Sequence, residues 1–165
     1  MSFFSLHKVK KTLNANYIRF FLLNFLKNLC VNKRGTHEMR KFKSVNELVN
    51  TLKPDYPVYC IRLEQVKKST SFFKENFPGK VLYAVKTNPH EKIIKEIISN
   101  GIKDFDVASL AEIKLIKKMN SEVNLHFMHT IKSKESISSA YFDYGVKSFS
   151  LDNRDELRKI LEATN

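Results

Sequence analysis

From residue 80 onward, short runs of β-branched and aromatic residues alternate with longer amphipathic segments. The runs have the composition of strands, and the apolar residues of the longer segments recur at helical spacing. This alternation is typical of parallel strands joined by helical crossovers. The pattern therefore predicts four strand–helix units. Their strands are expected at 81–86, 104–108, 124–129 and 147–151, and their helices at 90–99, 110–118, 133–143 and 154–163.

The sequence also resembles itself at a spacing of 44 residues. GIKDFDVASLAEIKLI, from Gly101 to Ile116, aligns with GVKSFSLDNRDELRKI, from Gly145 to Ile160. One repeat holds two strand–helix units, which suits a TIM-like (β/α)8 barrel. The fold class predicted is α/β, with four units that make the amino-terminal half of such a barrel. An isolated half leaves two open strand edges, so we expect it to pair with something else or to fold poorly.

Helix boundaries are marked by glycines and by capping residues. Gly101 and Gly145 each follow a helical segment, where a left-handed residue is favoured. Asn88, Ser109 and Asn153 each precede a glutamate by three residues, the spacing of a helix start with an N-cap. In the first of these, a proline follows the cap.

Three segments are expected along the chain. Residues 1–38 form a basic, partly apolar extension with a net charge of +6, half of the +12 of the whole chain. Their apolar run at 17–31 is interrupted by polar residues and is too short for a membrane span, so an extension outside the fold is expected, with a targeting or membrane-surface helix as the alternative. Residues 39–79 form a lead-in strand and helices, and residues 80–165 form the partial barrel domain.

The composition narrows the class of protein. With 42% apolar residues, the chain is globular rather than a disordered polyelectrolyte. Two cysteines without a Cys-x-x-Cys motif exclude a disulfide framework and a thiolate zinc site, and they favour a reducing, cytoplasmic location. No metal site is expected. The lysines after residue 39 are interleaved with acids, so we expect a solvated basic surface and no nucleic-acid partner.

Lys86 is the most informative candidate for chemistry. It ends the predicted strand LYAVK, in which alternation places Leu82, Ala84 and Lys86 on one face. If that face is the barrel interior, Lys86 lies at the carboxyl rim, where barrel enzymes place catalytic groups. A partly desolvated lysine there becomes an amine nucleophile suited to Schiff-base chemistry. A lysine that simply leaves the strand for solvent is the alternative.

Three further residues lie near the same rim. Asp106 faces inward by the same alternation, where it would fix the charge and orientation of a nearby cation, although a strand-end aspartate that binds backbone is an equal alternative. Glu112 occupies the acid position of a helix cap. His129 ends the third strand at the position that matches Lys86, and it suits stacking on or hydrogen bonding to a flat ligand.

Two motifs then point to a family. YAVKTNPH, followed after a helix by FDVASLAEI, resembles the cofactor-binding lysine region and next strand of the ornithine, diaminopimelate and arginine decarboxylases, which have an alanine-racemase-type barrel. FMHTIKSKESI and FSLDNRDEL extend the resemblance, which spans about residues 45–165 and is nearest to bacterial ornithine or lysine/ornithine decarboxylases. The resemblance implies pyridoxal 5'-phosphate (PLP) as cofactor, with Lys86 as its Schiff-base lysine and Asp106 and Glu112 lining the cofactor side of the site.

The same resemblance implies a diamino-acid substrate, with putrescine and polyamine biosynthesis as the outcome. Family members continue through the rest of the barrel and a β-domain, which supply the phosphate loop and the acid on the ring nitrogen. We therefore expect the 165-residue chain to be inactive alone, and to act in a family homodimer or with a complementary carboxy-terminal fragment. A non-catalytic remnant or interaction protein, a diaminopimelate or lysine decarboxylase fragment, and a racemase or PLP carrier remain alternatives.

Overall fold

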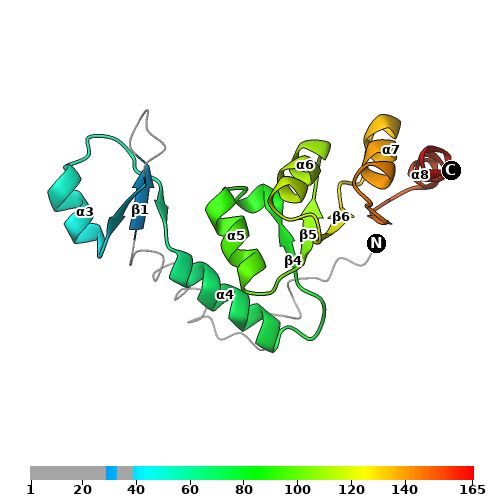
Figure 1. Cartoon of the computed structure of the whole chain (residues 1–165). Coiled ribbons are helices and arrows are strands. Elements are labelled where there is room, and N and C mark those ends of the chain that lie inside the picture. Colours follow the sequence, from blue (N-terminus) through cyan, green and yellow to red (C-terminus); the bar gives the residue numbers. More distant parts are fainter. Residues whose placement is uncertain (1–28, 33–38) are drawn as a thin grey trace. The chain divides into compact units, whose positions relative to one another are not determined.

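The computed structural model describes residues 29–32 and 39–165, which form two compact units. The first unit holds the described residues up to Gln65, and the second runs from Val66 to Asn165. Figure 1 shows their helices and strands, with labels on many of them.

The first unit is a small antiparallel sheet with one helix. Its elements are β1 (Leu29–Asn32), β2 (Met39–Phe42), α3 (Val45–Leu52) and β3 (Cys60–Ile61). The strands lie in the order β2-β1-β3. Leu48 of α3 is 2% exposed and forms the centre of this unit's core, packed against partly buried side chains that include Phe42 and Val58. The hydroxyl of Ser44 caps α3 by accepting a hydrogen bond from the Glu47 N–H at 3.1 Å.

Strand β1 bears on the expected amino-terminal extension. Its four residues lie within the 1–38 segment and pair with both β2 and β3, so this part of the segment belongs to a sheet rather than lying outside the fold. The rest of the interrupted apolar run from Tyr17 lies outside the described residues.

The second unit contains the predicted strand–helix repeats. The long helix α4 (Leu63–Asn76) leads into it from the first unit. The repeats that follow are β4 (Leu82–Ala84), α5 (Glu91–Ser99), β5 (Asp104–Val107), α6 (Leu110–Met119), β6 (Asn124–Phe127), α7 (Lys134–Phe142), β7 (Ser148–Phe149) and α8 (Arg154–Thr164).

The four strands are parallel and lie in the order β4-β5-β6-β7 (Figure 1). Each pair is joined through one helix, so the predicted α/β class with a parallel sheet of alternating units is confirmed. The helix-facing positions are apolar, and Phe105 and Val107 are fully buried there, with Phe127 at 2% exposure. The opposite face carries Asp106 and His126, which gives the sheet one apolar and one polar side.

The capping predictions hold at two of the three helix starts. Ser109 and Asn153 cap α6 and α8 by accepting hydrogen bonds from the N–H groups of Glu112 and Glu156 at 3.3 and 2.8 Å. The prediction at Asn88 is wrong, because α5 begins after His90. Asn88 instead uses its side-chain oxygen to accept a hydrogen bond from the His90 N–H at 3.2 Å, which holds the approach to the helix.

The two predicted helix-ending glycines adopt left-handed backbone conformations. Gly101 has φ of 89° and Gly145 has φ of 69°. A side chain is disfavoured at such angles, which explains why glycine stands at both ends.

Candidate functional site

Lys86 lies just beyond the carboxyl end of β4 rather than within the strand. The strand was predicted over 81–86, but it ends at Ala84, and Val85–Thr87 form a short 3-10 turn. The Thr87 hydroxyl donates to the Ala84 carbonyl at 2.7 Å, and the Asn88 N–H donates to the Val85 carbonyl at 3.2 Å. These two bonds close the turn, which ends the strand pairing and leaves the Lys86 side chain exposed.

The turn is anchored from beneath by apolar contacts. Val85 is fully buried, and the ring of Tyr83 packs edge-on against Phe105 with centroids 6.2 Å apart. The Tyr83 hydroxyl also donates to the carbonyl of Asn88 at 3.0 Å, which ties the strand to the far end of the turn. The backbone that carries Lys86 is therefore fixed on both sides of that residue.

Asp106 is a carboxylate whose pKa responds to the charge of Lys86. It is half-buried in β5, in register with Ala84 of β4 and His126 of β6. Burial raises the pKa of Asp106, while the positive charges of Lys86 and His126 act in the opposite direction. Asp106 lies opposite Ala84, two residues before Lys86, so two of the four predicted site residues lie at the same end of neighbouring strands.

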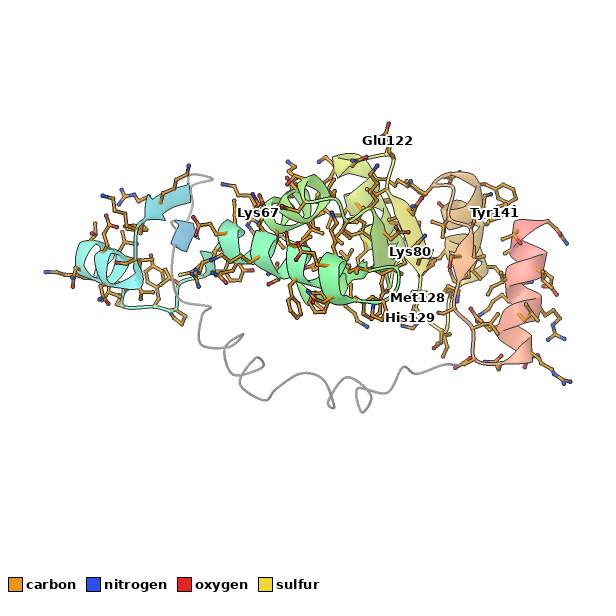
Figure 2. All side chains as sticks on the ribbon, turned by 90° about the horizontal axis from the view of Figure 1, so that it is seen from below. Lys67, Lys80, Glu122, Met128, His129 and Tyr141 are labelled. Atoms are coloured by element: carbon orange, nitrogen blue, oxygen red, sulfur yellow. The ribbon has the colours of Figure 1, made fainter. Side chains whose placement is uncertain are left out.

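Glu112 and His129 make local contacts instead. The Glu112 carboxylate accepts a hydrogen bond from the Ala108 N–H at 2.8 Å, as expected of an acid that caps the start of α6. His129 is exposed beyond the end of β6, and its Nδ1 accepts a hydrogen bond from the Ile131 N–H at 3.2 Å. Figure 2 shows His129 next to Met128 past the end of that strand.

The sequence analysis did not predict a second group of polar contacts on this sheet face, which centres on Asp104. His126 Nε2 lies 2.9 Å from the Asp104 carboxylate, and Lys80 Nζ lies 3.4 Å from it. Burial alone would raise the pKa of Asp104, but hydrogen bonds from His126 and Lys80 and the charge of Lys80 outweigh burial and hold this pKa below its usual value. His126 lies opposite Asp106 in the register and contacts the Asp104 carboxylate, so one ring joins the two acidic positions of β5.

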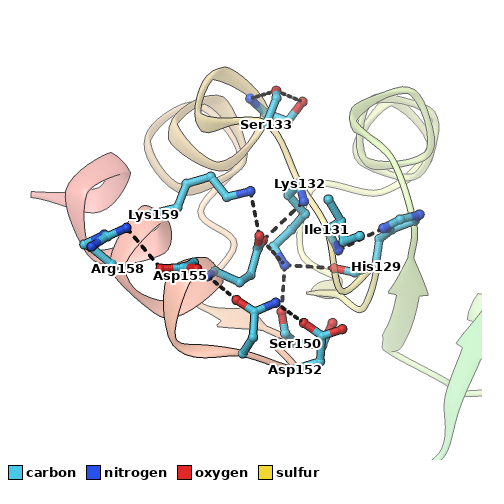
Figure 3. A network of polar contacts seen from close by, with 12 residues as sticks. His129, Ile131, Lys132, Ser133, Ser150, Asp152, Asp155, Arg158 and Lys159 are labelled. Carbon is cyan, nitrogen blue, oxygen red and sulfur yellow. Dashed lines mark hydrogen bonds and ion pairs between the residues drawn. The ribbon is translucent and has the colours of Figure 1, made fainter.

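A buried ion pair joins the loop that follows β6 to the first turn of α8 (Figure 3). The Lys132 side chain is fully buried, and its Nζ lies 2.9 Å from the Glu156 carboxylate. It also donates to the carbonyls of His129 and Ser150 at 2.8 and 2.6 Å. Lys159 Nζ lies 2.6 Å from the second oxygen of Glu156. This cluster fixes the carboxyl edge of the sheet, on which His129 lies.

Across residues 29–32 and 39–165, no group of three or more His, Cys, Asp or Glu side chains is placed to hold a metal ion. In the same part of the chain, no helix is long and apolar enough to cross a membrane.

Comparison with known proteins identifies the family. Residues 63–165 match the family described as pyridoxal-dependent decarboxylase, pyridoxal binding domain. The lysine/ornithine decarboxylase of Selenomonas ruminantium is 26% identical over 129 residues, covering 76% of this chain and 32% of the relative. The ornithine decarboxylase of Neurospora crassa is 33% identical over 103 residues, covering 59% and 20%.

A solved structure agrees with the sequence match. The crystal structure of SrLDC in complex with PLP and cadaverine is 27% identical with a TM-score of 0.63, and the alignment covers 76% of this chain and 33% of that one. The chain belongs to the pyridoxal-dependent decarboxylase family, through its pyridoxal-binding domain. It spans a third or less of the length of the curated relatives named here.

Proposed function

We propose that the chain supplies the PLP-binding portion of a decarboxylase that acts on a basic diamino acid, with ornithine as substrate and putrescine as product. The observation that supports the proposal is the position of Lys86 just after β4, next to the register pair of Ala84 and Asp106, in the domain that matches the family. The two relatives described above are a lysine/ornithine decarboxylase and an ornithine decarboxylase. SrLDC was solved in complex with PLP and cadaverine.

The residues present fit the aldehyde end of PLP. Lys86 offers an exposed amine on a backbone turn that is fixed from both sides, so its Nζ has room to bond to an aldehyde carbon. When bound, PLP supplies an electron sink for the electrons released when a carboxylate leaves the substrate. Proteins in general use such a cofactor by orienting it and by tuning its charge.

Asp106 and His126 are proposed to supply that tuning. Asp106 is half-buried beside the Lys86 charge, so its carboxylate balances the positive charge that Lys86 carries when protonated and accepts a proton near that amine. His126 is held at 2.9 Å by Asp104, which keeps its ring on the polar face of the sheet. Asp104, Asp106 and His126 together maintain a polar, hydrogen-bonded surface next to Lys86.

Spectroscopic titration tests the proposal. PLP is added to the purified chain, and the visible absorbance that PLP gains on bonding to an amine is followed. We expect saturable binding that is lost in Lys86→Ala and kept in Lys92→Ala, which removes another exposed lysine, from α5. Equal binding by both variants would contradict the role of Lys86 and would favour a non-catalytic interaction protein.

Activity is tested separately with ornithine. Because the chain spans a third or less of these relatives, we expect no carbon dioxide release from ornithine by the 165 residues alone. Release that is abolished by Lys86→Ala would show that this region suffices for the reaction, contrary to that expectation.

A further inference from the structure

His126 of β6 connects two acidic positions of β5. It lies opposite Asp106 in the parallel register, so both side chains stand on the same face of the sheet. Its Nε2 atom lies 2.9 Å from the carboxylate of Asp104, which precedes Asp106 by two residues on that face. Adjacent strands are about 4.8 Å apart, so the ring that Asp104 holds also lies beside Asp106.

The contact with Asp104 decides where His126 binds a second proton. Burial alone would raise the pKa of Asp104, but the hydrogen bonds from His126 and Lys80 hold this pKa below its usual value. Asp104 is therefore a carboxylate at neutral pH and only accepts hydrogen bonds. The neutral His126 ring keeps its hydrogen on Nε2, so a second proton binds at Nδ1 and makes the ring positive. The His126 side chain is 18% exposed, so water can deliver that proton.

Asp106 responds to the charges of two neighbouring side chains. It is half-buried, and burial raises its pKa, whereas the positive charges of Lys86 and His126 oppose this effect. Histidine side chains in general carry their proton in the acidic range where carboxyl groups titrate. With a positive ring opposite it, Asp106 ionises at a lower pH than it would beside a neutral side chain.

Lys80 is the other cation at Asp104. Its Nζ lies 3.4 Å from the same Oδ1 atom that His126 contacts. The Lys80 side chain is 63% exposed, so water and salt screen its charge. On β7, the residue opposite His126 is Ser148, which is uncharged. His126 is thus the cation placed directly opposite Asp106, and Lys80 provides a comparison charge at the same acid.

We propose that His126 is a positioning residue for Lys86. Asp104 holds the ring in place, and the charge of the ring keeps Asp106 ionised. The Asp106 carboxylate can then accept the proton that the Lys86 amine must lose before it bonds to an aldehyde carbon. This role rests on the proposed function, in which Asp106 accepts a proton near that amine. A histidine on the next strand thereby offsets the effect of burying the acid.

Carbon-13 NMR of the full 165-residue chain without PLP tests this role through the titration of the Asp106 carboxyl group. The Asp106 signal is the one that Asp106→Asn removes. His126→Gln keeps a side-chain donor for Asp104 but removes the charge, so the pKa of Asp106 should rise by about one pH unit. Lys80→Gln is the control, and it should leave this pKa within about 0.3 of the parent value. Circular dichroism verifies that the variants keep their helices.

The parent chain provides a test that needs no variant. Because the two groups interact, the ring signal of His126 should show a step at the pH at which Asp106 titrates. The absence of that step, an unchanged Asp106 pKa in His126→Gln, or an equal rise in Lys80→Gln would overturn the role of His126, whatever the result with PLP.

The pH dependence of PLP uptake separates the charge of His126 from a purely structural contribution. At about pH 5, uptake by Lys86 should be slower in His126→Gln by up to about tenfold, since a change of one pH unit alters the ionised fraction of Asp106 by at most that factor. At about pH 8, Asp106 is ionised in both chains and uptake should be equal. Equal slowing at both pH values would overturn the role of His126. If the Asp106 pKa rises but the parent chain takes up no PLP at Lys86, the proposed function is wrong and the coupling of His126 to Asp106 stands.

Discussion

Substitution of Glu156 by glutamine should destabilise the second unit more than any exposed charge change. Glu156 is 3% exposed, and its carboxylate binds Lys132 at 2.9 Å and Lys159 at 2.6 Å. Glutamine keeps the side-chain volume but removes the negative charge, so the fully buried Lys132 ammonium loses its counter-charge. Breaking a buried ion pair from one side costs about 3–5 kcal/mol. We expect a loss near the lower figure, because two carbonyls continue to accept from Lys132.

Two comparison variants separate the charge effect from other effects. Lys132→Met should cost less than Glu156→Gln, because Glu156 keeps its contact with Lys159. Asp155→Asn breaks a pair with Arg158 at 3.0 Å in which both side chains are at least 72% exposed. An exposed pair of this kind contributes about 0–1 kcal/mol, so this variant should stay near the parent chain.

The assay is urea unfolding followed by circular dichroism at neutral pH, with the free energy of unfolding compared between variants. The dependence of the free energy of unfolding on pH is an independent test of the role of Glu156. Burial alone would raise the pKa of Glu156, but the hydrogen bonds and charges of Lys159 and Lys132 hold it below the ordinary value of 4.5. Stability from this group is therefore complete above pH 4.5 and lost as pH falls through the lower folded pKa. Equal costs for Glu156→Gln and Asp155→Asn would refute this account of the cluster.

Three smaller predictions follow from local geometry and use the same unfolding assay. Asp106→Asn should raise stability near neutral pH. Burial raises the folded pKa of Asp106 above 3.8, so the parent chain loses stability as pH rises above 3.8 and the carboxyl group ionises, whereas asparagine does not ionise. The same dependence of stability on pH in the variant and the parent would argue against this. Ser109→Ala should cost about 1 kcal/mol by removing the hydrogen bond to the Glu112 N–H, whereas no loss would mean that the cap is dispensable. Gly145→Ala should also cost about 1 kcal/mol, because φ is 69° although no atom lies within 4 Å of an added Cβ, and an unchanged midpoint would contradict this conformational argument.

Apolar periodicity and capping residues predicted the units of the sheet because these signals are local. The four predicted strand–helix units are all present, and the caps at Ser109 and Asn153 formed as expected. The end of β4 was predicted two residues too late. Alternation along LYAVK does not reveal that the Thr87 hydroxyl and the Asn88 N–H bond backward to close a turn.

The polar contacts between strands were not predictable, because they depend on register. His126 and Asp104 are 22 residues apart, and neither lies in a recognisable motif. Lys132 and Glu156 are 24 residues apart and meet only because β6 and β7 are neighbours, which brings the loop after β6 to the first turn of α8. Once the sheet order was known, alternation alone would have placed Asp104, Asp106 and His126 on one face.

Reductive trapping on Lys86 tests the central claim most directly. The chain is incubated with a small excess of PLP and treated with borohydride, which makes the bond between an amine and the cofactor permanent, and the peptides are then mapped by mass spectrometry. The account predicts that the cofactor mass is found selectively on the peptide containing Lys86, and that Asp106→Asn reduces this selectivity. Labelling spread evenly over exposed lysines such as Lys92 and Lys95, with Lys86 not preferred, would contradict it.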